Sequence, residues 1–267
     1  AAMNRPSAPT INNVAPGWNE TFGPSLSIEA EPPRDMGDGG QGLITTLAYE
    51  MFITGSDNKQ GEFNSGSTPP TLSFSVSPST ALINRTITKA DFPASRQDQV
   101  ETLLGKGKDA YVWIRANNNA NYLSGGNELY WSDYSETGDV VIAGLPGAVN
   151  MATLTLEGDL TVKLSWESPS DKGLGDGRAY PISSFQYAAV DSNITLITPL
   201  QEAIVTGNAS GSTTISGLQK GTIYFFSVRA ANDIGFGPWF QHIDCTSYTL
   251  FHRPSTCGFT AMSFPNL

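Results

Sequence analysis

The stretch Leu218-Gln-Lys-Gly-Thr-Ile-Tyr224-Phe-Phe226-Ser-Val228-Arg-Ala230-Ala-Asn232-Asp-Ile-Gly235-Phe-Gly237-Pro-Trp239 decides the fold class. Its apolar residues Tyr224, Phe226, Val228 and Ala230 alternate with other side chains, which is the period of a β-strand that presents one face to a core. A Tyr at the start of such a strand, with a Leu six residues earlier, is typical of a tyrosine corner, where the phenol hydrogen-bonds upstream backbone. The stretch therefore predicts a β-sandwich.

The residues upstream of this strand complete a recognisable order of motifs. Leu160-Thr-Val-Lys-Leu-Ser-Trp166 alternates in the same way, and a turn rich in Pro, Asp and Gly leads to Pro181-Ile182 and Phe185-Gln-Tyr187. Over about residues 146 to 248 this order resembles a fibronectin type III module. The resemblance implies an immunoglobulin-like β-sandwich whose structural anchors are Trp166, Leu218 and Tyr224.

The first half of the chain repeats the pattern in a divergent form. Leu104–Ala116 aligns on Leu218–Ala230 without a gap, and such internal repetition indicates tandem modules. Two anchors are missing, because Ala30 stands at the position of Trp166 and Ala110 at that of Tyr224. We expect other aromatic residues to fill this core: Trp113, Tyr111, Phe52 and Phe74.

The sequence thus predicts an all-β chain of two immunoglobulin-like sandwiches in tandem. We place the first, divergent module at residues 6–142, the second at 143–250 and a C-terminal extension at 251–267. The first module carries an insertion around residues 55–95, rich in Gly, Ser, Thr and Pro. Within it Thr71–Val76 and Thr86–Thr88 have the composition of strands, which would add a hairpin at the edge of a sheet.

One short helix is predicted in the first module, over residues 95–104. Val100, Leu103 and Leu104 lie three and four apart, Pro93 precedes them, and Gly105 offers a left-handed stop. Two interpretations remain open: a helical crossing between the two sheets, which we favour, and a binding element.

Charge and hydropathy argue against nucleic acid binding and against a membrane-spanning segment. The net charge is −10, and the densest basic cluster is Lys106-Gly-Lys108, too little to neutralise a phosphate backbone. Apolar runs stay below the roughly 18 residues that span a bilayer. We expect neither nucleic acid binding nor a membrane span. Because Pro6-Ser-Ala-Pro9 already suits the start of a first strand, one hypothesis is that the chain is a processed or excised piece of a longer protein.

The cysteines and the glycosylation motifs bear on the compartment. Cys245 and Cys257 follow the last predicted strand. We give equal weight to two interpretations, a local disulfide and two unrelated buried thiols. A zinc site that adds His242 and His252 matches no common ligand spacing. Four acceptor triplets for N-linked sugar permit secretion without establishing it: Asn19, Asn84, Asn193 and Asn208. We expect an extracellular or surface-exposed location, on a cell or a virion.

The sequence lacks the usual motifs of enzymes, such as a nucleophile elbow, a phosphate-binding loop or a zinc-protease helix. Paired carboxylates occur only in two Gly-rich turns, at Asp35 and Asp38 and at Asp171 and Asp176. Calcium binding is one interpretation. We favour the other, in which these side chains accept hydrogen bonds from turn amides. The expectation is a protein that is not an enzyme and holds no metal or cofactor.

The candidate recognition surface lies in Asn117–Tyr134, where an Asn-rich loop leads into an aromatic segment. Tyr and Trp offer large contact area and Asn adaptable hydrogen bonds. The predicted binding residues are Asn119, Asn121, Tyr122, Tyr130, Trp131 and Tyr134. An alternative is that these aromatics cover the core in place of the missing Trp.

Two function classes remain. The favoured one is a structural or adhesive pair of modules that contacts other protein subunits, or further copies of itself, in a surface, filament or particle assembly. The second is a carbohydrate-binding module that stacks glycans on Tyr122, Tyr130 and Trp131.

Overall fold

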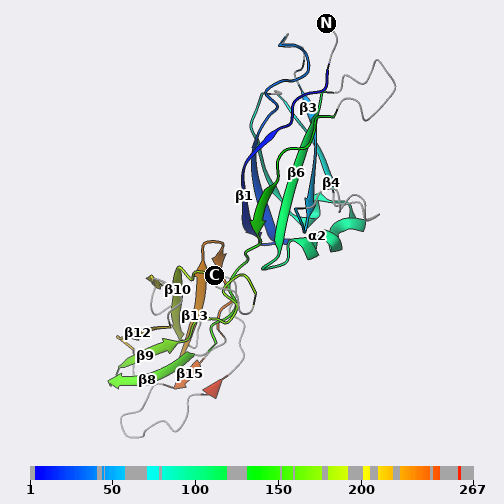
Figure 1. Ribbon diagram of the computed structural model, residues 1–267. Helices are drawn as coiled ribbons and strands as arrows, with labels where there is room; N and C mark the ends of the chain where they lie inside the picture. The colour runs from blue at the N-terminus through cyan, green and yellow to red at the C-terminus, as the bar shows by residue number, and fades with distance from the viewer. Residues whose placement is uncertain are drawn as a thin grey trace. The chain divides into compact units, whose positions relative to one another are not determined.

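The computed structural model divides the chain into two compact units, Ala1–Gly144 and Leu145–Leu267, and each unit has its own sheets and core (Figure 1). The structure describes the chain except for these residues: 1–3, 41–43, 45, 58–70, 78–79, 119–130, 151, 159, 176–179, 192–200, 205–209, 219–222, 241–242, 247–257 and 260–267.

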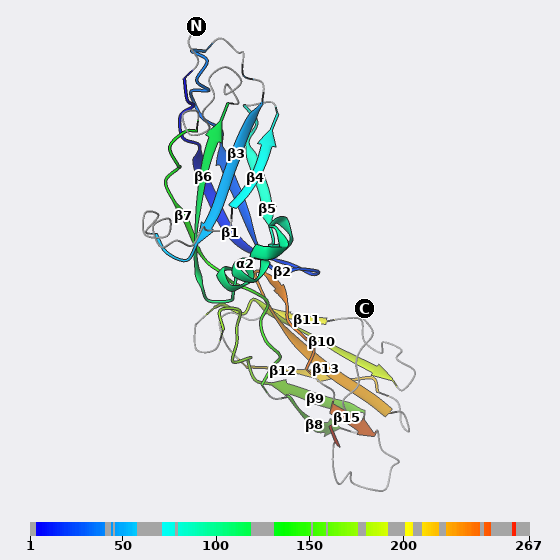
Figure 2. The same ribbon diagram turned by 90° about the vertical axis from the view of Figure 1, so that its right-hand side faces the viewer.

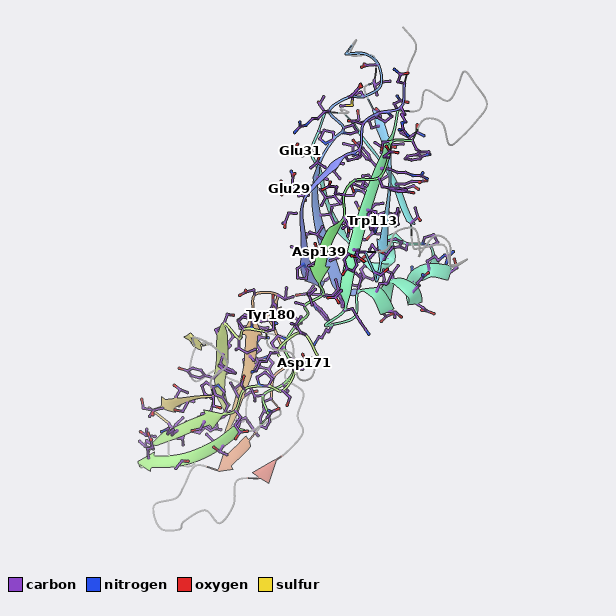
Figure 3. All side chains as sticks on the ribbon, in the orientation of Figure 1. Glu29, Glu31, Trp113, Asp139, Asp171 and Tyr180 are labelled. Atoms are coloured by element: carbon purple, nitrogen blue, oxygen red, sulfur yellow. The ribbon has the colours of Figure 1, made fainter. Side chains whose placement is uncertain are left out.

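Unit 1 is a sandwich of two antiparallel sheets. One sheet has the order β1-β2-β5 and the other β4-β3-β6-β7 (Figure 2). The strands are β1 (Thr10–Asn19), β2 (Gly23–Glu31), β3 (Leu47–Thr54), β4 (Thr71–Val76), β5 (Ile83–Ile87), β6 (Asp109–Asn117) and β7 (Gly138–Val141). Along β2 the side chains of Glu29 and Glu31 point away from the interior, whereas Ile28 and Ala30 are buried (Figure 3).

Unit 2 has the same strand order. Its sheets are β12-β9-β8 and β11-β10-β13-β15, with β14 paired to β13 and β16 paired to β15. The strands are β8 (Ala152–Gly158), β9 (Thr161–Trp166), β10 (Ser184–Asp191), β11 (Gln201–Ile204), β12 (Gly211–Ile215), β13 (Ile223–Asn232), β14 (Gly235–Phe236), β15 (Ile243–Thr246) and β16 (Gly258–Phe259). The all-β class and the tandem arrangement predicted from the sequence are therefore confirmed.

The two units also share the register of their central strands. Tyr49 of β3 lies opposite Ala116 of β6, and Phe185 of β10 lies opposite Ala230 of β13. All four are buried and all four belong to the core of their unit. In each unit a large ring is thus accommodated by a small residue on the neighbouring strand.

The missing Trp of unit 1 is replaced by an exchange of bulk between strands. In unit 2 the Trp166 ring lies against Gly211 of the neighbouring strand, where an added Cβ would come within 2.6 Å of it. In unit 1 the small residue is Ala30 on the central strand, and its partners are Ile11 and Ile83. The corresponding layer of the core is filled in both units, because a small residue on one strand can be compensated by larger residues at the facing positions of its neighbours.

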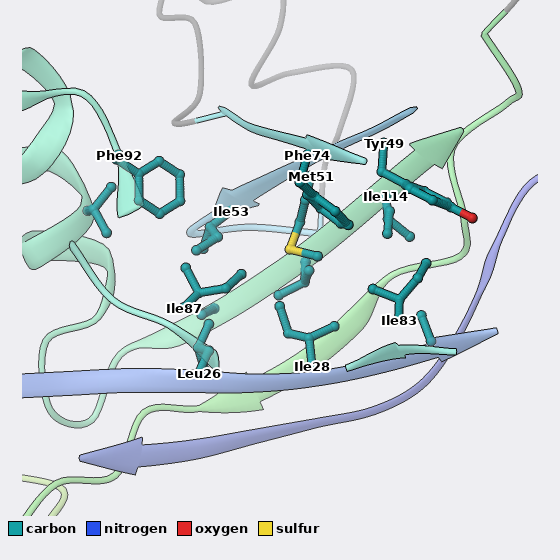
Figure 4. Packing of buried hydrophobic residues seen from close by; sticks show 14 of the residues in the cluster. Leu26, Ile28, Tyr49, Met51, Ile53, Phe74, Ile83, Ile87, Phe92 and Ile114 are labelled. Carbon is teal, nitrogen blue, oxygen red and sulfur yellow. The ribbon is translucent and has the colours of Figure 1, made fainter. Parts of the chain in front are cut away.

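The missing corner Tyr is replaced by the helical crossing. Two 3₁₀ turns, η1 (Lys89–Asp91) and η2 (Ala94–Arg96), lead into α2 (Gln97–Leu103) between β5 of one sheet and β6 of the other. Phe92, Val100 and Leu104 from this segment are buried in the core of unit 1, and Phe92 lies near Ile53 and Ile87 (Figure 4). The favoured interpretation of the helix as a crossing between sheets is confirmed.

The expected aromatic fillers are partly corrected. Phe74 does enter the core, stacked on Tyr49 with ring centres 5.4 Å apart. Phe52 and Trp113 are buried on the other face of their sheet, because Trp113 alternates with the inward-facing Val112 and Ile114. Tyr111 is only half-buried. The residue that the sequence prediction missed is Tyr49.

Two local predictions are wrong. β4 pairs with β3 and β5 with β2, so the two strands inside residues 55–95 belong to opposite sheets of the sandwich and do not form an edge hairpin with each other. The left-handed residue after the helix is Gly107, with φ of 73°, rather than Gly105. Gly105 instead continues the turn by donating its N–H to the carbonyl of Thr102 at 3.3 Å.

The Tyr49 hydroxyl is buried without a hydrogen-bond partner among the described residues. We predict that Tyr49→Phe keeps the free energy of unfolding of unit 1 or raises it by up to about 2 kcal/mol, because it removes an unsatisfied polar group. Tyr49→Ala should instead cost about 3 to 5 kcal/mol through the lost ring. Urea titration followed by NMR signals of β3 and β6 measures both. A clear loss of stability in Tyr49→Phe would show that the hydroxyl has a partner.

The same hydroxyl gives an alkaline pH dependence. Burial raises the pKa of Tyr49 from 10.0 to about 12. The folded state therefore favours the neutral phenol, and its contribution is fully present below pH 10 and is lost as the pH rises toward about 12. Between these pH values the stability of the wild type should fall more steeply than that of Tyr49→Phe. Parallel curves for the two proteins in pH-dependent urea titrations would contradict this.

Candidate interaction surface

The outer face of the β4-β3-β6-β7 sheet is organised around Arg115 of β6. Its Nε and Nη2 donate to Oε2 of Glu50, directly opposite on β3, at 2.9 and 2.6 Å. Its guanidinium carbon lies 4.6 Å from the ring centre of Trp131 and 4.9 Å from that of Tyr134. The side chains of Arg115 and Glu50 are only 17% and 25% exposed. Two rings thus shield a charge-assisted pair from water, which strengthens it.

The aromatic contacts continue along the same face. The edge of Tyr134 meets Phe52 at 4.8 Å and 85°, and Phe52 stacks on Trp113 at 6.2 Å and 19°. Nε1 of Trp113, labelled in Figure 3, donates to Oγ1 of Thr54 at 3.2 Å. We call Trp131, Arg115, Tyr134, Phe52 and Trp113 the outer-face ladder. It is a second packed layer, of four rings and one guanidinium group, outside the sandwich core.

Two serines hold the aromatic segment onto β6. Oγ of Ser132 accepts the N–H of Ala116 at 2.9 Å, and Oγ of Ser135 accepts the N–H of Ile114 at 3.1 Å. The N–H groups of the same serines donate back to the carbonyls of Ala116 and Ile114 at 2.8 and 2.7 Å. Ser132 and Ser135 are buried against the strand. Because the serines hold the segment against β6, Trp131 and Tyr134 are positioned to contact Arg115.

Unit 2 repeats the centre of this arrangement. Nε and Nη2 of Arg229 donate to Oε1 of Gln186, opposite on β10, at 2.8 and 2.5 Å. The guanidinium carbon lies 4.4 Å from the ring centres of both Phe236 and Trp239. Here the acceptor is a neutral amide in place of Glu50, and burial lowers the pKa of Arg229. The two units share an arginine, its polar partner and two rings.

The structure describes two of the six predicted binding residues. Trp131 and Tyr134 are half-buried and contact Arg115. A ligand role for them stays a prediction. The other four residues lie outside the described ones: Asn119, Asn121, Tyr122 and Tyr130. The predicted anchors of unit 2 are all buried in its core: Trp166, Leu218 and Tyr224.

Arg115 and Glu50 were missed as parts of this surface. The sequence does contain a signal for them, because the gapless repeat places Arg115 on Arg229 and several aromatic residues follow each arginine. An arginine on a strand with two aromatics downstream indicates a stacked pair, since guanidinium groups pack well on ring faces.

The carboxylates of the Gly-rich turns accept backbone hydrogen bonds. Oδ1 of Asp35 accepts from the N–H of Gly37 at 2.8 Å, and Oδ1 of Asp171, marked in Figure 3, accepts from Gly173 at 2.8 Å and Gly175 at 3.0 Å. These contacts support the interpretation of the carboxylates as turn residues. Among the described residues no group of three His, Cys, Asp or Glu could hold a metal ion. Asp176 is not among the residues that the structure describes.

An asparagine fixes each of these turns to the end of the central strand. Nδ2 of Asn118 donates to the carbonyl of Met36 at 3.0 Å, and Nδ2 of Asn232 donates to that of Lys172 at 2.9 Å. Both asparagines are buried. In unit 1 the turn also needs Gly37, with φ of 85°, because a Cβ there would lie 2.0 Å from the carbonyl oxygen of Asn4. The turn is therefore closely packed against the N-terminal segment.

The remaining predicted sites are only partly visible. Cys245 lies in β15, but its side chain and the whole of Cys257 fall outside the described residues, as do His242 and His252, so the disulfide stays a prediction. Asn193 and Asn208 also fall outside them. Asn19 ends β1, and Asn84 is exposed on β5. No helix in the described part of the chain is long and apolar enough to cross a membrane.

The comparison with protein-family models agrees with the fold of unit 2. Residues 148–246 match the family model of the fibronectin type III domain. A crystal structure of the chicken CNTN1 FN1–FN3 domains is similar at a TM-score of 0.43 and 15% identity, over 93% of this chain and 70% of that one. The Twitchin kinase region from C. elegans has a TM-score of 0.33 and 19% identity, over 42% and 18% of the two chains. The family match confirms the fibronectin type III module recognised from the sequence.

The arginine at the centre of the outer-face ladder should be sensitive to conservative exchange. We predict that Arg115→Lys lowers the free energy of unfolding of unit 1 by about 1 to 2 kcal/mol, because an ammonium group cannot hold two N–H groups on one oxygen of Glu50 and also stack on two rings. Arg34→Lys, at an exposed position, is the matched control and should change nothing measurable. Equal stabilities of the two variants in urea titrations would refute the stabilising role of the ladder.

Proposed function

We propose that this chain is a non-catalytic structural or adhesive pair of modules that makes protein–protein contacts in a surface, filament or particle assembly. The fibronectin type III match supports a protein-interaction module in general. The partners are other protein subunits or further copies of the chain, and the location is extracellular or surface-exposed. The polar groups described above serve turns and strands, which suits a scaffold.

The observation that carries the proposal is the composition of the edge strand β4. β4 ends the sheet order β4-β3-β6-β7, and no described strand pairs with its outer side. Thr71-Leu-Ser-Phe-Ser-Val76 contains no charged residue and no Pro, the devices that usually protect an edge. Ser73 and Ser75 are exposed while Phe74 is buried. An edge of this kind accepts an added strand from a partner through backbone hydrogen bonds.

Carbohydrate binding is the alternative, with Tyr122, Tyr130 and Trp131 as a stacking platform. Arg115 already contacts the Trp131 ring at 4.6 Å. A sugar would therefore have to use the remaining surface of that ring. This reduces the support for the alternative.

A lysine on the exposed side of β4 should weaken the proposed contact. We predict that Ser75→Lys lowers the capture of protein partners from the native source, or self-association in sedimentation velocity, at least tenfold, because an edge lysine opposes strand addition. Thr80→Lys, at an exposed turn position between β4 and β5, is the matched control and should behave as wild type.

The same proteins separate the two functions. Binding on a glycan array that Trp131→Ala abolishes, together with no loss of protein contacts in Ser75→Lys, would contradict the proposal and favour the carbohydrate-binding alternative.

A further inference from the structure

The turn between β1 and β2 has a fixed backbone. Asn19 and Gly23 pair at its base, so Glu20, Thr21 and Phe22 form a three-residue loop. Gly23 has φ of 80°, as expected where a tight turn is followed by a left-handed residue. Oδ1 of Asn19 accepts the N–H groups of Thr21 and Phe22, both at 2.9 Å. The loop is thus held by the side-chain oxygen of Asn19.

Two large aromatic side chains flank Asn19 at this turn and face water. Trp18 is 36% exposed and Phe22 is 41% exposed. Cη2 of Trp18 lies 3.8 Å from the place a Cβ would take on Gly23, so the ring extends over the turn. Both rings therefore leave apolar surface in water that a group attached at the turn could cover.

The chemistry of the turn identifies an occupant. Asn19-Glu20-Thr21 is an acceptor triplet for N-linked sugar, and Thr21 is exposed. Nδ2 of Asn19 makes no hydrogen bond to any described residue, because the turn uses only its oxygen. Asn84 offers a poorer context: it lies within β5, and the hydroxyl of Thr86 lies 3.4 Å from that of Ser27.

We infer that Asn19 carries an N-linked glycan whose first N-acetylglucosamine packs its apolar face on Trp18 and Phe22. In the reaction Nδ2 of Asn19 forms a bond to the anomeric carbon of a sugar held on a lipid diphosphate. The bond from that carbon to the phosphate oxygen breaks, the lipid diphosphate leaves, and the amide proton passes to a base of the transferase. The sugar then removes aromatic surface from water, which stabilises the turn.

This inference requires passage through a secretory pathway but no particular assembly partner. Its failure would leave the proposed protein contacts at β4 untouched. The test therefore uses a eukaryotic secretory host that makes high-mannose glycans. The full chain carries Asn84→Gln, Asn193→Gln and Asn208→Gln, so that Asn19 is the one acceptor triplet left among the four.

The expected result has two parts. Intact mass shows a glycan at Asn19, which Thr21→Ser retains and Thr21→Ala abolishes while Asn19 and its turn bonds stay in place. The midpoint of thermal unfolding of unit 1 falls by about 2 to 4 °C in Thr21→Ala. Trimming the glycan to a single N-acetylglucosamine with an endoglycosidase keeps the wild-type midpoint, because only the first sugar contacts the rings.

A Trp18→Ala background tests the packing. There the glycosylated and Thr21→Ala proteins should unfold at the same temperature. Secreted protein without sugar at Asn19 would overturn the inference. So would equal midpoints with and without the glycan while Trp18 and Phe22 are intact, or a difference that persists unchanged in Trp18→Ala.

Discussion

The rest of the structure depends on the register between two pairs of central strands. These are β3 with β6 in unit 1 and β10 with β13 in unit 2. Because side chains alternate along a strand, a slip of one residue would turn every inward-facing side chain outward. In unit 1 the register that places Tyr49 against Ala116 inside also places Glu50 against Arg115 outside. The pairing of β10 with β13 produces the same two layers in unit 2. One backbone alignment thus sets both the core and the arginine-centred outer face.

Much of this frame could be predicted from the sequence, because alternation and repetition are local signals. The strand around Tyr224, the gapless repeat and the helix around Val100 are examples. Sequence patterns could not predict how the large Trp166 side chain of unit 2 is replaced in unit 1 by larger residues on neighbouring strands. This compensation depends on which residues of neighbouring strands face each other. The position of Trp131 was hard to predict for a related reason: its contact with Arg115 follows from Ser132 and Ser135, which bind β6 at long range.

The fold separates residues that build the scaffold from residues available to partners. The turn carboxylates, the buried asparagines and the outer-face ladder all make contacts within their own unit. Among the described residues, the surfaces that we propose for recognition are the edge strand β4 and the aromatic turn around Asn19. An edge that accepts a strand and a turn that carries a sugar are compatible on one surface protein, because a glycan limits contact at its own turn and leaves other faces open. The proposed function depends on this division.

Residue-resolved amide hydrogen exchange on the full chain tests the central claim most directly, namely two separately stable sandwiches built on the same central register. The account predicts that the paired amides of β3 with β6, and of β10 with β13, are the best protected, and that the two sets open with separate free energies. A single cooperative set that spans both units, or protection of β6 shifted by one residue along the strand, would contradict it.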